Sequence, residues 1–129
     1  MIEPQMNSIT AAIVDIYGEK NEGGMLCCTL ETVNTDGLDV SIQVMAGSIS
    51  LTPYPYAEDP LTRLELSGAL ETLGHLQLDL VDWDANAFAT VGTSGNDPAE
   101  IACLIDQTFR KMLRCPPDYA LKVSKEDLS

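Results

Sequence analysis

Hydrophobic and polar residues alternate most regularly along residues 39–45. Apolar residues fill one set of alternate positions and mostly polar residues fill the other; the apolar ones are Val40, Ile42 and Val44. Successive side chains of a strand point to opposite faces, so this period predicts a strand with one buried face and one wet face. Residues 25–33 also have strand composition, and a turn over residues 34–37 joins the two segments into an antiparallel hairpin.

Further short strands are predicted over residues 48–52, 75–83 and 88–93, and residues 119–123 are a candidate for one more. Within 75–83 the leucines Leu76, Leu78 and Leu80 are expected to face inward. Residues 88–93 follow after a turn and are expected to pair with that strand as a hairpin. The sequence therefore predicts a sheet of about five strands.

A helix is the clearest expectation near the C-terminus. Asp97 supplies an N-cap and Pro98 occupies the first helical position, which proline tolerates because no hydrogen bond is lost there. Residues suited to a buried face then recur at helical spacing; the apolar ones are Ile101, Ala102, Leu104, Ile105, Phe109, Met112 and Leu113, and Thr108 shares their face. We expect this helix to cover the buried face of the sheet and to end before the pair Pro116–Pro117.

Two segments fit a helix and a strand almost equally. Residues 8–18 place apolar side chains at helical spacing, with Asn7 or Ser8 as the N-cap, but they are also rich in β-branched residues. Residues 59–73 begin with Asp59–Pro60, a good helix start, and carry a stripe of apolar residues at Leu66, Ala69, Leu70 and Leu73. Their leucines also alternate at strand period, and Gly68 disfavours a long helix. A helix is favoured in both segments, with a strand as the alternative.

The fold class expected from these elements is α+β. It consists of an antiparallel sheet of about five strands, a C-terminal helix packed on one face, and one or two further helices. The chain has 129 residues of which 45% are hydrophobic, enough for one domain spanning residues 1–129. Residues from about 124 onward are expected to form a short polar tail.

Charge is the strongest functional signal. The formal net charge is -13 at pH 7, and fourteen acidic residues lie between Asn21 and Phe109 against one base, Arg63. Such a body repels phosphates and anionic lipid, so we expect no direct nucleic-acid binding and no membrane association. It attracts a basic protein partner. The residues we expect to contact this partner are Asp79, Asp82, Trp83 and Asp84.

Several short motifs were weighed as sites of chemistry, and none is complete. Residues 82–86 place oxygen ligands at alternate positions, but Ala87 and Thr93 stand where a calcium loop needs glycine and glutamate. Residues 92–96 precede the C-terminal helix, as a phosphate-binding loop would, but no lysine or arginine flanks them. His75 is the only histidine and lacks a catalytic companion. We therefore expect no cofactor, no metal, no catalytic residue and no enzymatic activity.

The four cysteines indicate a reducing compartment. Cys27 and Cys28 are adjacent in a predicted strand and would point to opposite faces, which makes a disulfide between them strained. We expect reduced thiols, three of them small buried residues at Cys27, Cys28 and Cys115. The first residues lack the basic and apolar regions of a signal peptide, and no apolar run is long enough to span a bilayer. The expected location is cytoplasmic.

With both ambiguous segments helical, the element order is helix, three strands, helix, two strands, helix. In its element order, size and acidity the chain resembles the class I type III secretion chaperones over Ile9 to Arg114. The resemblance implies an acidic, homodimeric, non-enzymatic protein that holds an extended segment of a secreted effector. It rests on no diagnostic motif, so it assigns a role to no single residue.

Three functions remain open at this point. The first is a protein-binding protein, either a secretion chaperone or an immunity-type inhibitor of a basic toxin. The second is a nucleic-acid mimic whose carboxylates imitate phosphates and block a DNA- or RNA-binding protein. The third is a small enzyme of unknown chemistry. A homodimer is expected because a small sheet leaves open edges that need cover.

Overall fold

The computed structural model describes residues 4–18, 25–85 and 87–127. Its elements, in chain order, are α1 (Pro4–Ile16), β1 (Leu26–Val33), β2 (Asp39–Met45), β3 (Ser48–Thr52), α2 (Pro60–Ser67), β4 (Asp79–Asp84), β5 (Phe88–Gly92), α3 (Pro98–Gln107), the π-helical turn η2 (Thr108–Met112) and β6 (Lys122–Asp127). The fold is α+β, as predicted. No helix in the described part of the chain is both long and apolar enough to cross a membrane.

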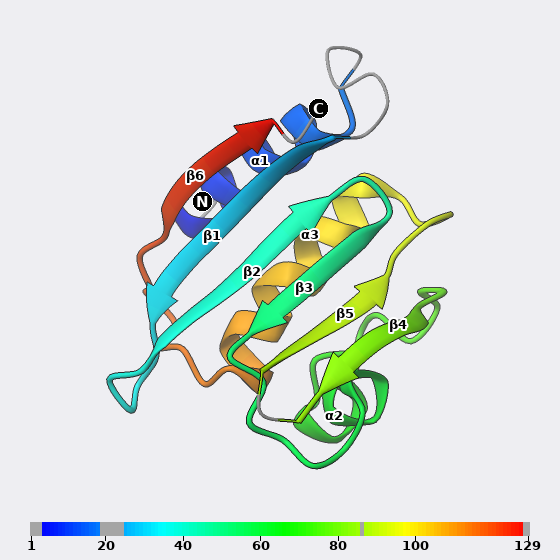
Figure 1. Cartoon of the computed structure of the whole chain (residues 1–129). Helices are drawn as coiled ribbons and strands as arrows, with labels where there is room; N and C mark the ends of the chain where they lie inside the picture. Colours follow the sequence, from blue (N-terminus) through cyan, green and yellow to red (C-terminus); the bar gives the residue numbers. More distant parts are fainter. Residues whose placement is uncertain (1–3, 19–24, 86, 128–129) are drawn as a thin grey trace.

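The sheet is antiparallel and has six strands in the order β4-β5-β3-β2-β1-β6 (Figure 1). The predicted hairpin of β1 and β2 is confirmed, with Leu30 opposite Ile42. Its turn contains Gly37 at φ 80°, a left-handed conformation that glycine adopts without strain. Beyond the roughly five strands expected, β6 adds a sixth by pairing with β1, so β4 and β6 form the two edges.

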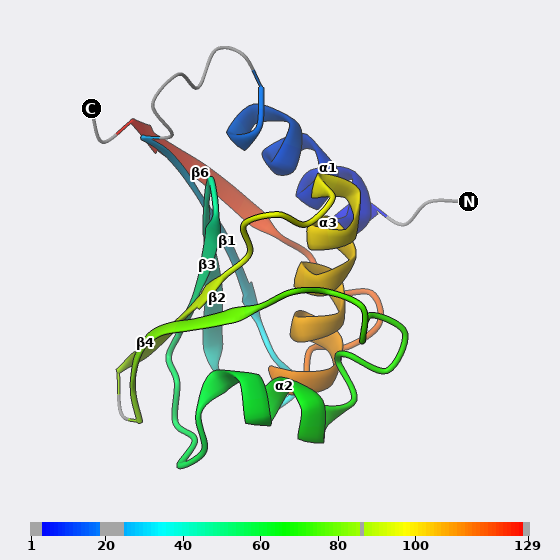
Figure 2. The same cartoon turned by 90° about the vertical axis from the view of Figure 1, so that its right-hand side faces the viewer.

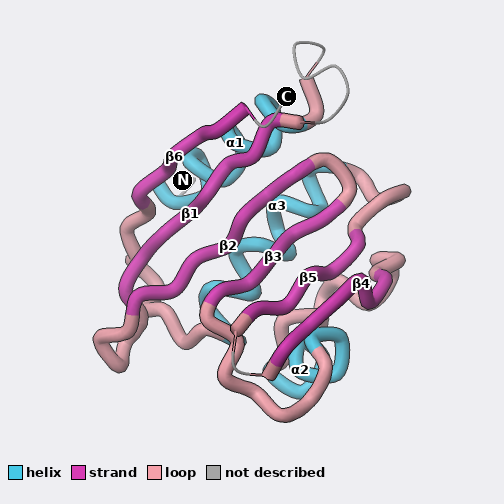
Figure 3. Tube along the Cα trace, in the orientation of Figure 1, coloured by secondary structure: helices cyan, strands magenta, loops and turns pink. Residues whose placement is uncertain are grey.

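The helices all lie on one side of the sheet. Figure 2 shows α1 and α3 side by side against one face, with α2 beside the end of the sheet that carries β4 and β5. The opposite face carries no helix among the described elements (Figure 3). The molecule therefore has two layers, and one sheet face remains uncovered.

The core lies between these two layers, and hydrophobic alternation fills it from both sides. The strands contribute Leu30, Ile42, Val44, Ile49 and Leu51, and α3 contributes Leu104 and Ile105, each 0% exposed. Burial of one such side chain stabilises the fold by roughly 1.5–3 kcal/mol. The prediction that the C-terminal helix covers the buried face of the sheet is confirmed.

Both ambiguous segments are helical. α1 begins at Pro4, upstream of the Asn7 or Ser8 cap that we expected, because its first turn accommodates a proline. At the start of α2 the Asp59 carboxylate accepts a hydrogen bond from the Thr62 amide at 3.0 Å, as its cap pattern indicates.

The apolar stripe expected along α2 is wrong at one position. Leu66 is 65% exposed, because the helix ends at Ser67 and turns a different side toward the core. The side chains of this helix that are buried are Pro60 and Leu64. Ala69 and Leu73 are also buried, but they lie in the turns that follow the helix.

Two strand predictions are also corrected. β4 begins at Asp79 rather than at residue 75. Leu80 lies opposite the buried Val91 and therefore faces the helix side as expected, but it is 45% exposed rather than buried. The cause is an edge position combined with a β-bulge between Leu80 and Asp82. Near the C-terminus the strand covers Lys122–Asp127, so residues expected to form a polar tail pair with β1 instead.

Candidate partner-binding surface

The uncovered sheet face is mostly polar, with a few apolar side chains, among them Val33 and Phe88. One row of residues crosses all six strands through successive cross-strand pairs and consists of Asp82, Thr90, Ser50, Gln43, Thr29 and Ser124. The Ser50 and Thr90 hydroxyls are 2.9 Å apart and bond to each other. We call this side of the sheet, formed by the outward residues of β1 to β6, the uncovered face.

A bulge brings three of the predicted site residues onto the uncovered face. Asp79 lies opposite Gly92, Asp82 opposite Thr90, and Asp84 opposite Phe88. In a regular strand Asp79 would point away from Asp82, because the two positions differ by an odd number of residues. The register shift at Val81 adds one residue to β4 and thereby aligns all three carboxylates.

Gly92 permits the close approach of the two edge strands. A Cβ atom at this position would lie 3.2 Å from Cβ of Asp79 and 3.4 Å from Cγ2 of Val81. Both separations are tight, so a larger residue would push β4 away from β5. The glycine therefore contributes to the placement of Asp79.

Trp83 does not join the three aspartates. Its ring is half-buried on the helix side of the sheet and packs edge-on against Tyr54, with ring centroids 5.9 Å apart. Tyr54 in turn is fully buried and packs edge-on against Tyr56, with ring centroids 5.2 Å apart. The structure therefore places Trp83 in the core-facing layer and the aspartates in solvent.

The uncovered face is strongly anionic. Six carboxylates project from it, and they belong to Glu31, Asp39, Asp79, Asp82, Asp84 and Glu126. The side chain of Lys122, which lies across from Glu31, is the one Lys or Arg of the described residues that projects from this face. A basic surface would be attracted to it.

Most of the described bases are paired with acids away from this face. The pairs are Arg63 with Glu58 at 3.9 Å, Arg110 with Asp106 at 2.9 Å, Arg114 with Asp36 at 3.4 Å, and Lys125 with Asp15. Their acids lie on α1, on α3 and in two connections rather than on outward sheet positions. Internal ion pairing therefore leaves the uncovered face with an excess of negative charge.

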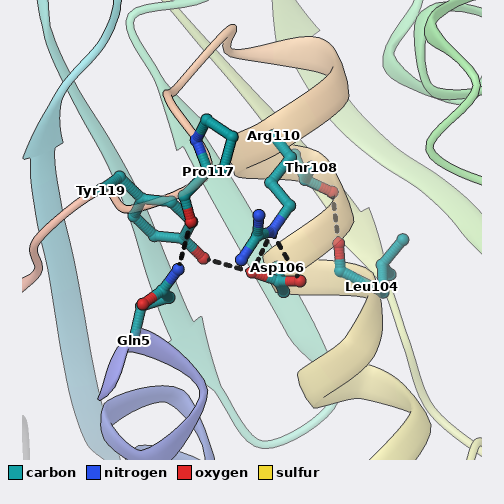
Figure 4. A network of polar contacts seen from close by, with 7 residues as sticks. All are labelled: Gln5, Leu104, Asp106, Thr108, Arg110, Pro117 and Tyr119. Carbon is teal, nitrogen blue, oxygen red and sulfur yellow. Dashed lines mark hydrogen bonds and ion pairs between the residues drawn. The ribbon is translucent and has the colours of Figure 1, made fainter. Parts of the chain in front are cut away.

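A buried polar network joins α1, α3 and the segment that precedes β6 (Figure 4). Asp106 is 8% exposed, and its carboxylate accepts a hydrogen bond from the Tyr119 hydroxyl at 2.6 Å. The single N–H at Nε of Arg110 is shared between both carboxylate oxygens, at 2.9 and 3.0 Å. The Gln5 amide donates to the carbonyl of Pro117 at 2.6 Å. These contacts fix the chain after η2 against both helices.

This network is structural rather than chemical. Burial, reinforced by the hydrogen bond to Asp106, raises the pKa of the Tyr119 phenol well above its ordinary value. The phenol therefore stays protonated as a donor. The network could not be predicted from the sequence, because Asp106 interrupts an apolar helix pattern and Tyr119 was expected to lie in a strand.

The short motifs singled out in the sequence lie at separate places in the described chain. Asp82 and Asp84 point out from β4, and Asn86 of the same motif lies outside the described residues. Asp97 caps α3 with its own carboxylate, which accepts from the Ala99 amide at 3.0 Å. Nε2 of His75 lies 2.8 Å from Oε1 of Glu100. No group of three His, Cys, Asp or Glu side chains in the described residues could hold a metal ion.

The cysteines are all free thiols, and the three expected to be buried are buried. Burial raises the pKa of Cys27 and Cys28, and it raises the pKa of Cys115 to about 11. Thiolate is the reactive form, so these three are poor nucleophiles near neutral pH. Cys103 alone of the four is exposed, on α3.

Comparison with known proteins gives no relative from which residue roles could be transferred. No protein-family model matches the chain, and neither a curated protein nor a solved structure matches it. The candidate surface therefore rests on the geometry of this chain alone.

Proposed function

We propose that this protein is a non-enzymatic binding protein that holds a basic protein partner on the uncovered face. The observation that carries the proposal is the alignment of Asp79, Asp82 and Asp84 by the bulge in β4, on a face with a single described Lys or Arg side chain. Electrostatic attraction of this kind speeds association and selects partners of opposite charge. The large excess of acids over bases in the whole chain acts in the same direction.

A role similar to that of a secretion chaperone is the form of this function that we favour. The order helix, three strands, helix, two strands, helix, on which the resemblance rests, is present from α1 to α3. β6 follows as an additional strand. An immunity-type inhibitor would use the same face, so the proposal for the surface is the same for both roles. A cytoplasmic location is part of the proposal and is supported by the four free thiols.

The proposal is tested by the salt dependence of partner binding. The partner is first isolated from the native cell on the tagged, full-length protein and identified. Its affinity for the wild type is then compared with its affinity for a double variant, Asp79→Asn with Asp82→Asn. The variant should bind more weakly at low ionic strength, and the slope of affinity against salt should be flatter, since each carboxylate lost removes part of the screened attraction.

A matched control separates local charge from net charge. Glu65→Gln with Glu71→Gln changes the net charge by the same amount at exposed positions on and after α2. This control should keep nearly the wild-type slope. Equal slopes for the wild type and the Asp79→Asn, Asp82→Asn variant would show that the uncovered face is only a solubilising surface.

A further inference from the structure

A groove of about 850 Å³ lies at the end of the β1–β2 hairpin that carries the turn between the two strands. It is bounded by the last three residue pairs of that hairpin, by the end of β3 and by the segment that leads from η2 into β6. Apolar and aromatic side chains form much of its lining, and they are Val33, Val40, Pro53, Pro116 and Tyr119. The groove therefore offers both volume and apolar contact area at one end of the uncovered face.

Carboxylates dominate the charge of this groove. Glu31, Asp39 and Asp118 line it, and all three are exposed. Lys122 is the one positively charged side chain in the lining, opposite Glu31 in the pairing of β1 with β6. The groove thus carries two more negative than positive charges, which favours a cationic occupant.

The walls of the groove are held in place before any ligand arrives. At the hairpin tip, the Thr35 amide and hydroxyl both donate to the carbonyl of Arg114, at 3.0 and 2.8 Å. On the opposite wall, Tyr119 is anchored by its 2.6 Å hydrogen bond to Asp106. A groove with anchored walls loses little conformational entropy on binding, so weak contacts suffice for recognition.

We propose that this groove binds an arginine side chain of the basic partner, presented by an extended segment that crosses the uncovered face. An arginine combines an apolar stem, which fits the apolar lining, with a guanidinium group that donates forked hydrogen bonds to carboxylates. Lysine offers a point charge without that fork. The inference deepens the proposed function and rests on it, because the arginine belongs to the same partner.

The test uses two short peptides and the full-length chain labelled with ¹⁵N. One peptide is acetyl-Gly-Arg-Val-Arg-Gly-amide, and the other carries citrulline, a neutral isostere, in place of both arginines. The arginine peptide should cause saturable shifts of amide resonances in residues 31–33, 39–41 and 118–122. The citrulline peptide should bind at least about fivefold more weakly, because it lacks the charge that the carboxylates attract.

Two double variants test whether the arginine peptide binds through the carboxylates of the groove. Asp39→Asn with Asp118→Asn should weaken binding of the arginine peptide about fivefold, since the attraction of two exposed carboxylates, each of modest strength, is lost. Glu65→Gln with Glu71→Gln makes the same change in net charge away from the groove and should leave the affinity nearly unchanged. All the substituted residues are exposed, and the spectra of the free variants verify that each remains folded.

Three results would overturn the groove assignment. They are equal binding of the two peptides, shifts confined to the β4 edge, and no saturable shifts at all. Shifts confined to β4 would disprove the groove but leave the proposed function standing. The proposed function fails separately, when the partner itself binds the Asp79→Asn, Asp82→Asn variant with an unchanged salt slope.

Discussion

Asp106 is a buried carboxylate among apolar neighbours on α3. The fold can accommodate its buried charge because nearby side chains donate hydrogen bonds to it. A buried charge without partners is costly, whereas one that is paired and hydrogen-bonded can be retained. Arg110 supplies the positive charge and Tyr119 supplies a second donor from a distant segment. At the residue scale, this carboxylate converts the end of α3 into an attachment point for the segment before β6.

The first prediction concerns that attachment. Tyr119→Phe removes the hydroxyl that donates to Asp106, so the free energy of unfolding should fall by about 1–3 kcal/mol. Chemical denaturation followed by circular dichroism measures the loss. Tyr17→Phe is the control, because Tyr17 is 38% exposed and its hydroxyl accepts only a long, exposed hydrogen bond of 3.3 Å from the Gly47 amide, so its replacement should change stability by less than about 0.5 kcal/mol. Equal losses for the two variants would contradict a structural role for the network.

At the scale of elements, the sequence predicted most helices and strands but not the detail that builds the candidate surface. The sequence pattern located an element where hydrophobic and polar residues alternate regularly, as in β2, or where a helix begins with a recognisable N-cap, as α3 does at Asp97. The bulge at Val81 left no such signal, because an extra residue in an edge strand is decided by pairing with β5. The three aspartates were identified as site residues, but their shared face could not be derived from alternation.

The strand β6 was misplaced for a related reason. Its six residues are all exposed, so no buried face produces a hydrophobic pattern that could mark its bounds. Pairing with Leu26–Glu31 of β1 defines the strand instead. Edge strands held mainly by backbone pairing are the elements that a pattern-based prediction is least able to locate.

The second prediction tests the bulge. Deletion of Val81 removes the extra residue and leaves Asp79, Asp82 and Asp84 on the same face in regular alternation, so the fold should persist. Deletion of Thr90 from β5 instead reverses the facing of every later residue in that strand and should cost at least about 2 kcal/mol more. Thermal unfolding compares the two. A Val81 deletion as damaging as the Thr90 deletion would exclude the bulge.

At the scale of the whole molecule, the two edges of the sheet differ in chemistry. β6 presents charged residues along its length, including two lysines, which discourage pairing with another sheet. β4 exposes Leu80 at 45% and Val81 at 59%, apolar side chains that leave this edge unprotected. The homodimer expected from the sequence would therefore form at β4 rather than at β6.

The third prediction follows from this asymmetry. We expect the wild-type mass in light scattering to rise toward that of a dimer across micromolar concentrations. Val81→Lys should shift the equilibrium toward monomer, because a charged lysine at an edge opposes sheet pairing. Val33→Lys changes a side chain that is 51% exposed at the hairpin end and serves as control. A wild type that stays monomeric over this range would disprove the dimer.

The proposed function depends above all on which face of the molecule the partner covers, and carboxyl footprinting measures this directly. Carbodiimide labelling of exposed carboxylates is compared between the free protein and its complex with the isolated partner, at equal salt. We predict that the complex protects Glu31, Asp39, Asp79 and Asp82 on the uncovered face, while Glu65 and Glu71 keep their labelling rates. Protection of Glu65 and Glu71, with the four carboxylates of the uncovered face still labelled as in the free protein, would contradict the account.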